Sequence, residues 1–373
     1  MMILVFAVIL GLLIIVHEAG HYFAARKLGV KVEEFALGFG PKLMSWTYDG
    51  TSFRLCLIPL GGYVKMAGDE RGKCQGASDE FFAKSPGHRA LIAVMGPVVN
   101  YVFAYVCFTL VFMFGYLDMD AAVKAMPARI GTVISGSPAA LSGLRSGDII
   151  LAVNGTKVSG WGEMQDIIAD AKGEPLQLSL DRAGEATALQ VVPVVEKGKD
   201  LFGRERPVSR IGIKPDEDIK PDSRFVRKYG LGRALVEGAK ELWTVTAKTY
   251  QAFWQMITGQ RSAREGMTGL IGIFFIIKFA AGVGFAFLLH IVGVISASLA
   301  IFNLLPLIPL DGGHIFLNGL EKLRGRPLSD KSDDLLNKAG FALIIVLAVF
   351  VFYLDFERIG LIDKILSFLP TKG

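Results

Sequence analysis

Residues 2–25 read MILVFAVILGLLIIVHEAGHYFAA, an apolar run that also contains two histidines and a glutamate. A helix needs about 20 mostly apolar residues to span the hydrocarbon core of a bilayer. The run has that length and is followed by Arg26 and Lys27, so it predicts a first transmembrane helix. It lacks a preceding basic segment and a small-residue cleavage pattern after it, and we therefore expect a retained span rather than a signal peptide.

Three further apolar runs predict three more membrane-spanning segments. With the first, the four segments cover residues 1–27, 90–117, 279–314 and 339–356, and regular helix in the third should end near residue 304. The composition agrees, because 52% of the 373 residues are apolar. The net charge of +5 comes from Lys and Arg that flank these runs rather than from a basic patch with interleaved aromatics, which argues against nucleic acid as a partner.

The distribution of Lys and Arg predicts which face of the membrane each loop occupies. Both are concentrated at residues 28–89 and 315–338, which the positive-inside rule places in the cytoplasm. The two termini and the long segment 118–278 then lie on the opposite face. The expected fold is a polytopic α-helical membrane protein of about four transmembrane helices, with the lipid bilayer as its solvent.

The long segment contains a soluble module at residues 128–195, where short apolar alternations are separated by turn residues. Asn154-Gly155 between two apolar stretches predicts a hairpin, because both residues tolerate the positive φ of a type I′ turn. The module resembles one PDZ domain of the kind found in bacterial envelope proteases in the order of its short stretches at 130–133, 137–139, 143–144, 147–150 and 153–155. Such a domain would bind a peptide or a segment of the substrate.

An amphipathic helical region is predicted at residues 223–278. Aromatic and apolar residues alternate with Lys and Glu from Leu231 to Ile257, a pattern typical of a helix at the membrane interface. The same pattern also fits a helix packed on the soluble module, so both interpretations stay open.

Histidines 17 and 21 are four residues apart with Glu18 beside the first, which is the H-E-x-x-H spacing. That spacing places both imidazoles on one face of a helix, where they can bind one zinc ion while the glutamate acts as base. Each ionisable group in a spanning helix costs about 2.5 to 3.5 kcal/mol on insertion scales, and a dication would compensate for that cost. The rival interpretations are an ion relay in a transporter or channel, and a catalytically silent PDZ scaffold.

A third zinc ligand must come from elsewhere, since a catalytic zinc usually has three protein ligands and one open position. Residues 303–314 read NLLPLIPLDGGH, in which two prolines should break the third span and Gly312-Gly313 permits close backbone approach. We prefer Asp311 as the third ligand. His314 is its main rival, and His88 and His290 are weaker candidates.

A protease inside a membrane must unwind its helical substrate, and a strand edge is one way to hold the unwound backbone. We expect a cytoplasmic, membrane-associated β-hairpin or sheet within residues 28–89. Its expected pieces are a Gly-rich turn at 37–41, a strand at 53–58 and a second strand at 59–66. The residues expected to contact the substrate are Gly61, Gly62, Asn303 and, with less weight, Asn100. Plain turn geometry for the glycines and helix–helix contact for the asparagines remain alternatives.

Taken in order along nearly the whole chain, these motifs and the stretch Gly96-Pro97-Val98-Val99-Asn100 are similar to those of the bacterial site-2 protease family. The resemblance implies Zn²⁺ as cofactor, with His17, His21 and Asp311 as zinc ligands, Glu18 as catalytic base and Asn303 as a substrate-binding residue. It also implies an intramembrane-cleaving endopeptidase of the bacterial inner membrane that takes part in regulated intramembrane proteolysis. Its implied substrates are single-span membrane proteins of the anti-sigma-factor type and remnant signal peptides. The chain departs from some members in carrying one PDZ copy rather than two.

Overall fold

The structure is a computed structural model that describes residues 1–118, 121–122, 126–199, 205–216, 225–260, 262, 268–327 and 329–358. The chain divides into two compact units. The helical unit comprises Met1–Phe114, Gly230–Gln251 and Met267–Gly373, and the β-rich unit comprises Gly115–Tyr229 and Ala252–Gly266. Each unit is described by itself.

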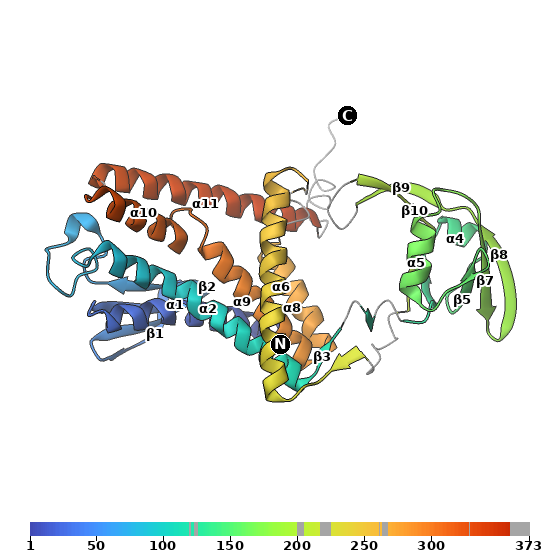
Figure 1. Ribbon diagram of the computed structural model, residues 1–373, viewed down its shortest axis with the longest axis horizontal. Helices are drawn as coiled ribbons and strands as arrows, with labels where there is room; N and C mark the ends of the chain where they lie inside the picture. The colour runs from blue at the N-terminus through green and yellow to red at the C-terminus, as the bar shows by residue number, and fades with distance from the viewer. Residues whose placement is uncertain are drawn as a thin grey trace. The chain divides into compact units, whose positions relative to one another are not determined.

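Among the described residues of the helical unit, four helices are long and apolar enough to cross a membrane. They are α1 (Met2–Lys27), α2 (Pro86–Phe114), α9 (Phe285–Asn303) and the part of α11 (Asp330–Arg358) from Leu335 to Glu357. Helix α2 packs against both α1 and α9 (Figure 1). Each of the four predicted spans corresponds to one of these helices, and this is compatible with a polytopic membrane protein.

Several span boundaries differ from the prediction, and two of the differences coincide with a glycine of positive φ. The second helix ends at Phe114 rather than at residue 117, because Gly115 has φ 136° and residues 116–117 form the short strand β3 (Tyr116–Leu117) with β12 (Val226–Arg227). The third apolar run is divided at Gly284, with φ 143°, into α8 (Leu270–Val283) and α9. Hydropathy does not reveal either break, since glycine is as compatible with an apolar run as with a turn.

Helix α6 (Leu231–Ile257) accounts for the predicted amphipathic region, although α8 takes up the end of that range. In the helical unit, α6 packs against α2 and α9 through a cluster of Ala104, Phe108, Val245 and Ala297. Trp243 lies on another face of α6 and is 71% exposed. The predicted loop at 315–338 is also largely helical, because α10 (Asp311–Arg324) and the start of α11 occupy it.

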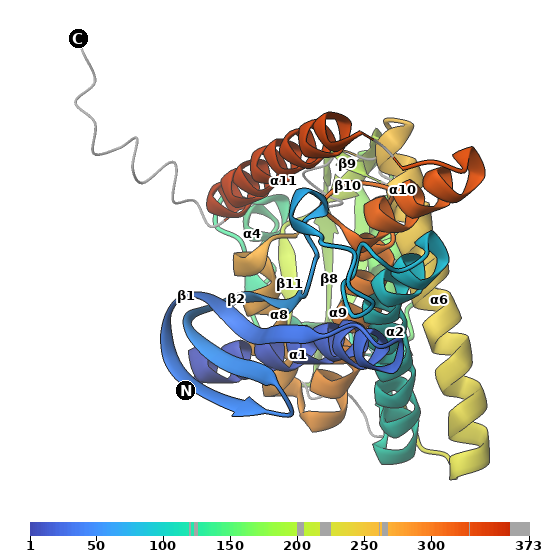
Figure 2. The ribbon, with the colours of Figure 1, turned by 90° about the vertical axis from the view of Figure 1, so that its left-hand side faces the viewer.

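Residues 28–89 contain two long antiparallel strands, β1 (Val32–Tyr48) and β2 (Thr51–Met66), which lie alongside α1 (Figure 2). Both strands bend, so that residues 32–37 of β1 pair with 62–66 on one side and with 52–55 on the other. The predicted Gly-rich turn at 37–41 is wrong, because β1 continues through it with a shift of register and the chain turns at Asp49-Gly50 instead. In the described pairing, residues 62–66 have a strand neighbour on one side only.

The β-rich unit contains a four-stranded antiparallel sheet in the order β6-β5-β7-β8. Its described elements are β4 (Ile130–Val133), α4 (Pro138–Leu141), β5 (Ile149–Val153), β6 (Thr156–Lys157), α5 (Trp161–Ala169), β7 (Leu176–Arg182), β8 (Glu185–Val191), β9 (Val194–Lys199), β10 (Glu205–Arg210) and β11 (Ile213–Pro215). The predicted hairpin is present between β5 and β6, where Asn154 and Gly155 have φ 50° and 77°. Buried apolar residues from α5 and these strands form one core, including Ile150, Met164 and Leu178.

Candidate metal centre

Helix α1 presents His17 and His21 on one face, as their spacing requires. The two rings meet edge to face with centroids 4.9 Å apart, and their Nε2 atoms are 3.3 Å apart. Both side chains are largely enclosed. The two nitrogens therefore converge on one point beside an apolar helix.

Asp311 reaches the same point from the broken segment after α9. Helix α9 ends at Asn303, and α10 begins at Asp311, so the two predicted proline breaks fall between regular helices. An added Cβ on Gly313 would lie 2.7 Å from the carbonyl oxygen of Leu307, so glycine allows this close turn. Asp311 Oδ2 lies 3.2 Å from His17 Nε2, and its Oδ1 lies 3.4 Å from His21 Nε2.

This donor set fits a zinc ion. One ligand atom each from His17, His21 and Asp311 lie within 4.8 Å of one another. Two imidazole nitrogens and one carboxylate oxygen match the three-ligand, open-position composition of catalytic zinc sites. In addition, Asp311 Oδ2 is buried and makes no hydrogen bond to the described residues, as expected of an oxygen meant for a cation.

The other histidines lie elsewhere. His88 contacts the Ser85 hydroxyl, and His290 on α9 is 3.0 Å from the Glu241 carboxylate on α6. His314 lines the cavity beside Asp311 but is not part of the three-residue cluster. Of the candidates for a third ligand, the geometry therefore favours Asp311.

Helix α2 contacts both imidazole rings. His21 Nδ1 lies 2.9 Å from the carbonyl oxygen of Ile92, so this nitrogen carries the proton and donates. His17 Nδ1 lies 3.4 Å from the Asn100 amide. Gly96 packs directly against both imidazoles, and a Cβ there would lie 2.9 Å from His17 Cε1. The contact of Ile92 has no signal in the sequence, because its contribution is a backbone carbonyl.

A cavity of about 700 Å³ opens onto this cluster. Glu18, Gly62 and Asn303 line it together with the edge residues 63–66 of β2. Gly62 is close to the expected base, because a Cβ on it would lie 3.1 Å from Glu18 Cγ. Asn100 is fully buried and does not line the cavity, a placement that does not favour its expected contact with substrate.

A buried ion-pair network that the sequence did not indicate holds α10 in place. Glu321 on α10 accepts hydrogen bonds from Arg89 on α2 at 2.6 Å and from Arg71 at 3.0 Å. Both guanidinium groups also lie over the Phe82 ring. Burial raises the pKa of Glu321, but the two arginines outweigh it, so the pKa lies below its usual value. The network connects α10, the helix that begins with Asp311, to the N-terminal end of α2.

Comparison with known proteins places the chain in a family. The pattern of peptidase family M50 matches residues 5–347. The chain is 33% identical over 344 residues to a Clostridium acetobutylicum protein, covering 91% of this chain and 93% of the relative. It is 30% identical over 368 residues to one from Agrobacterium fabrum, covering 95% of each chain, and 32% identical over 354 residues to one from Campylobacter jejuni, covering 94% and 92%. All three relatives are provisionally named zinc metalloproteases. The chain belongs to peptidase family M50 and is a zinc-dependent metalloprotease.

Proposed function

We propose that this protease is an endopeptidase that cuts single-span membrane proteins in or near their transmembrane segments. One observation carries the proposal: the convergent nitrogens and carboxylate belong to an apolar helix of membrane-spanning length and to the broken end of another. His21 precedes Lys27 by six residues, which places it about 9 Å along α1 from that charged end. The cleavage site therefore lies within the apolar span and near one face.

In this proposal His17, His21 and Asp311 hold the zinc ion, and Glu18 is the catalytic base. Zinc bound there would supply Lewis-acid activation of a water molecule and of the scissile carbonyl. Glu18 lines the same cavity and takes the proton of the attacking water. The same carboxyl group then returns a proton to the leaving amine.

The substrate backbone would add to the edge of β2. Residues 62–66 line the cavity and have a strand neighbour on one side only among the described residues, so their free edge can pair with an unwound segment. Gly62 has no side chain between that edge and Glu18. Asn303 also lines the cavity and can hydrogen-bond the substrate backbone. Gly61 is not among the lining residues, and its φ of 102° beside Phe39 shapes the strand instead.

We further propose that the protein lies in the bacterial inner membrane with its active site toward the cytoplasm. The excess of Lys and Arg at 28–89 and 315–338 supports this orientation, which leaves the β-rich unit and both termini outside. Anti-sigma-factor-type proteins and remnant signal peptides have the single spans that such a site would accept. The exposed Trp243 of α6 has the amphipathic ring that favours the membrane interface.

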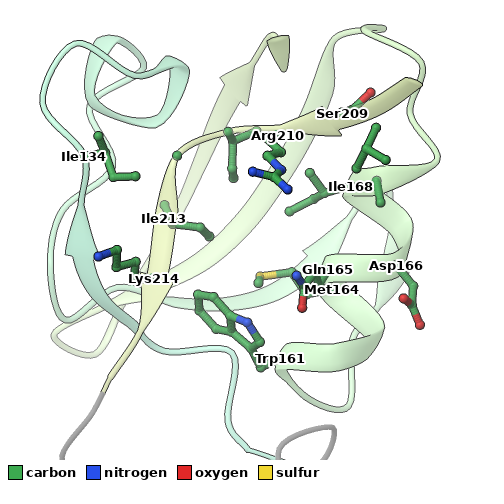
Figure 3. Close-up of a pocket in the computed structure, with 14 residues that line it drawn as sticks. Ile134, Trp161, Met164, Gln165, Asp166, Ile168, Ser209, Arg210, Ile213 and Lys214 are labelled. Carbon is green, nitrogen blue, oxygen red and sulfur yellow. The ribbon is translucent and has the colours of Figure 1, made fainter. Parts of the chain in front are cut away.

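The β-rich unit is, in this proposal, a PDZ domain that binds an extended peptide or a substrate segment. A groove of about 590 Å³ lies between α5 and residues 208–214. Figure 3 shows Trp161, Met164 and Ile168 of α5 on the side of the helix that faces Ile213. Strand β11 pairs with β4 on one side, so a peptide can add as a strand on the groove side.

Substitution of the base and of one ligand tests the proposed chemistry. Glu18→Gln preserves size and leaves all three zinc ligands intact, so the purified variant should keep its zinc but lose cleavage of a reconstituted single-span substrate by at least about 100-fold. His21→Ala should lose both zinc and cleavage. Glu237→Gln, which makes the same change at an ion pair with the exposed Lys240 on α6, is the matched control. Cleavage by Glu18→Gln at the wild-type rate would refute the role of Glu18.

A further inference from the structure

We infer that Asn100 is a positioning residue whose side-chain carbonyl accepts a hydrogen bond from Nδ1–H of His17 and so orients that ring for zinc. The inference rests on the proposed zinc ligands. It replaces the expected substrate contact of Asn100 with a role behind the metal site.

The direction of the two imidazoles is the first observation. Nε2 of each ring points toward Asp311, at 3.2 Å from His17 and 3.4 Å from His21. Nδ1 of each ring therefore points toward α2. His21 Nδ1 meets the carbonyl oxygen of Ile92, and the corresponding nitrogen of His17 meets the Asn100 amide. The two rings thus contact α2 at two positions that are eight residues apart in sequence.

The chemistry of a metal-bound imidazole decides which end of the amide faces His17. A neutral imidazole has one N–H, so a ring that binds zinc through Nε2 carries its proton on Nδ1 and needs an acceptor there. The structure places Asn100 Nδ2, a donor, 3.4 Å from this nitrogen, while Asn100 Oδ1 is buried with no hydrogen bond to described residues. Rotating the amide by 180° exchanges these two ends. In either orientation, one end of the Asn100 amide has no hydrogen-bond partner among the described residues, so the contact with His17 decides which orientation the amide takes.

The placement of Asn100 supports a role inside the protein rather than at the substrate. Its side chain is fully buried and lies outside the cavity lining. Its backbone is held separately, because Ser296 on α9 donates a 2.8 Å hydrogen bond to the Asn100 carbonyl oxygen. Partners of this kind fix the tautomer and orientation of zinc-bound histidines, and their removal typically lowers metal affinity by about 10 to 100-fold.

Zinc affinity of the full chain in detergent, measured by competition with a fluorescent chelator, tests the inference. Asn100→Leu is similar in size but cannot accept a hydrogen bond, so it should weaken zinc binding by about 10 to 100-fold. Asn100→Asp keeps an acceptor and should bind zinc at least as tightly as the wild type. Ser296→Ala, which removes only the bond to the Asn100 backbone, should leave zinc affinity unchanged. If Asn100 instead donates to substrate, both Asn100 variants will keep wild-type zinc affinity, and that result overturns the inference.

A second measurement covers the case in which a buried aspartate prevents folding. The chain has five histidines, so ¹⁵N-histidine labelling gives few ring signals in the zinc-loaded protein. The Nδ1–H signal of one zinc-bound histidine should shift in Asn100→Leu, and the absence of any shift would contradict the contact. If His17→Ala binds zinc as tightly as the wild type, the proposed ligand set and this inference both fail. If His17→Ala loses zinc while Asn100→Leu does not, only the inference fails.

Discussion

Gly96→Ala adds one methyl group against the imidazoles of the two proposed zinc ligands and should weaken zinc binding. The new Cβ would lie 2.9 Å from His17 Cε1 and still closer to the ring of His21. Carbon atoms in contact are ordinarily about 3.5 to 4.0 Å apart, so the His17 ring would have to move by about 0.6 Å. Zinc sites hold their ligand distances to within about 0.2 Å. A shift of this size should lower zinc affinity at least about 10-fold, by analogy with lost outer contacts.

A fall in zinc affinity would point to the clash with the imidazoles and not to a less stable α2 helix. Alanine favours a helix by about 1 kcal/mol over glycine, so the substitution should not weaken the helix itself. Gly87→Ala is the matched control, because it lies on the same helix and its Cβ would meet nothing within 4 Å. Zinc affinity is measured by chelator competition and cleavage by conversion of a single-span substrate. Wild-type values for both in Gly96→Ala would refute the packing argument.

Two further predictions concern the α10 network and the groove. Glu321→Gln should destabilise the protein by about 3 kcal/mol in thermal unfolding, because it leaves the buried Arg89 unpaired, whereas the exposed Glu33→Gln should cost less than about 1 kcal/mol. The pKa of Glu321 is lowered in the folded protein, so its contribution to the free energy of unfolding is fully present above the unfolded pKa of about 4.3 and is lost as the pH falls through the folded pKa. Equal losses of stability in Glu321→Gln and Glu33→Gln would contradict the network. Ala169→Trp should fill the α5 groove and abolish binding of an extended apolar peptide by fluorescence anisotropy, whereas the exposed Ala188→Trp on β8 should not. Unchanged binding in Ala169→Trp would remove the groove as the peptide site.

Much of the helical unit could be predicted because membrane spans depend on length and hydropathy, which are local properties. The predictions fail at positions where local hydropathy carries no information about the backbone conformation. The apolar run around Gly284 reads as one span, yet a positive φ divides it. The glycines at 37–41 read as a turn, but pairing of 32–37 with both halves of β2 keeps β1 extended. Only the long-range register of β1 with β2 decides whether residues 37–41 form a turn or continue the strand.

The candidate site shows the same division between local and distant information. Helical spacing alone places His17 and His21 on one face, and proline and glycine chemistry indicates a break near Asp311. The contacts behind the site join residues 71 and 83 positions apart, and the Arg89–Glu321 pair joins residues 232 positions apart. The carbonyl of Ile92 has no sequence signature at all. Asn100 was noticed as a polar residue in a span, but its partner could be identified only from the structure.

The position of the cleaved bond in a single-span substrate tests the central claim most directly. Wild-type protein and Glu18→Gln are reconstituted into vesicles with that substrate, and the product termini are identified by mass spectrometry. We expect the wild type to cut within or at the edge of the apolar segment, and Glu18→Gln to produce no such termini. Product termini that lie only in the extramembrane parts of the substrate, or that persist in Glu18→Gln, would contradict an intramembrane site at His17, His21 and Asp311.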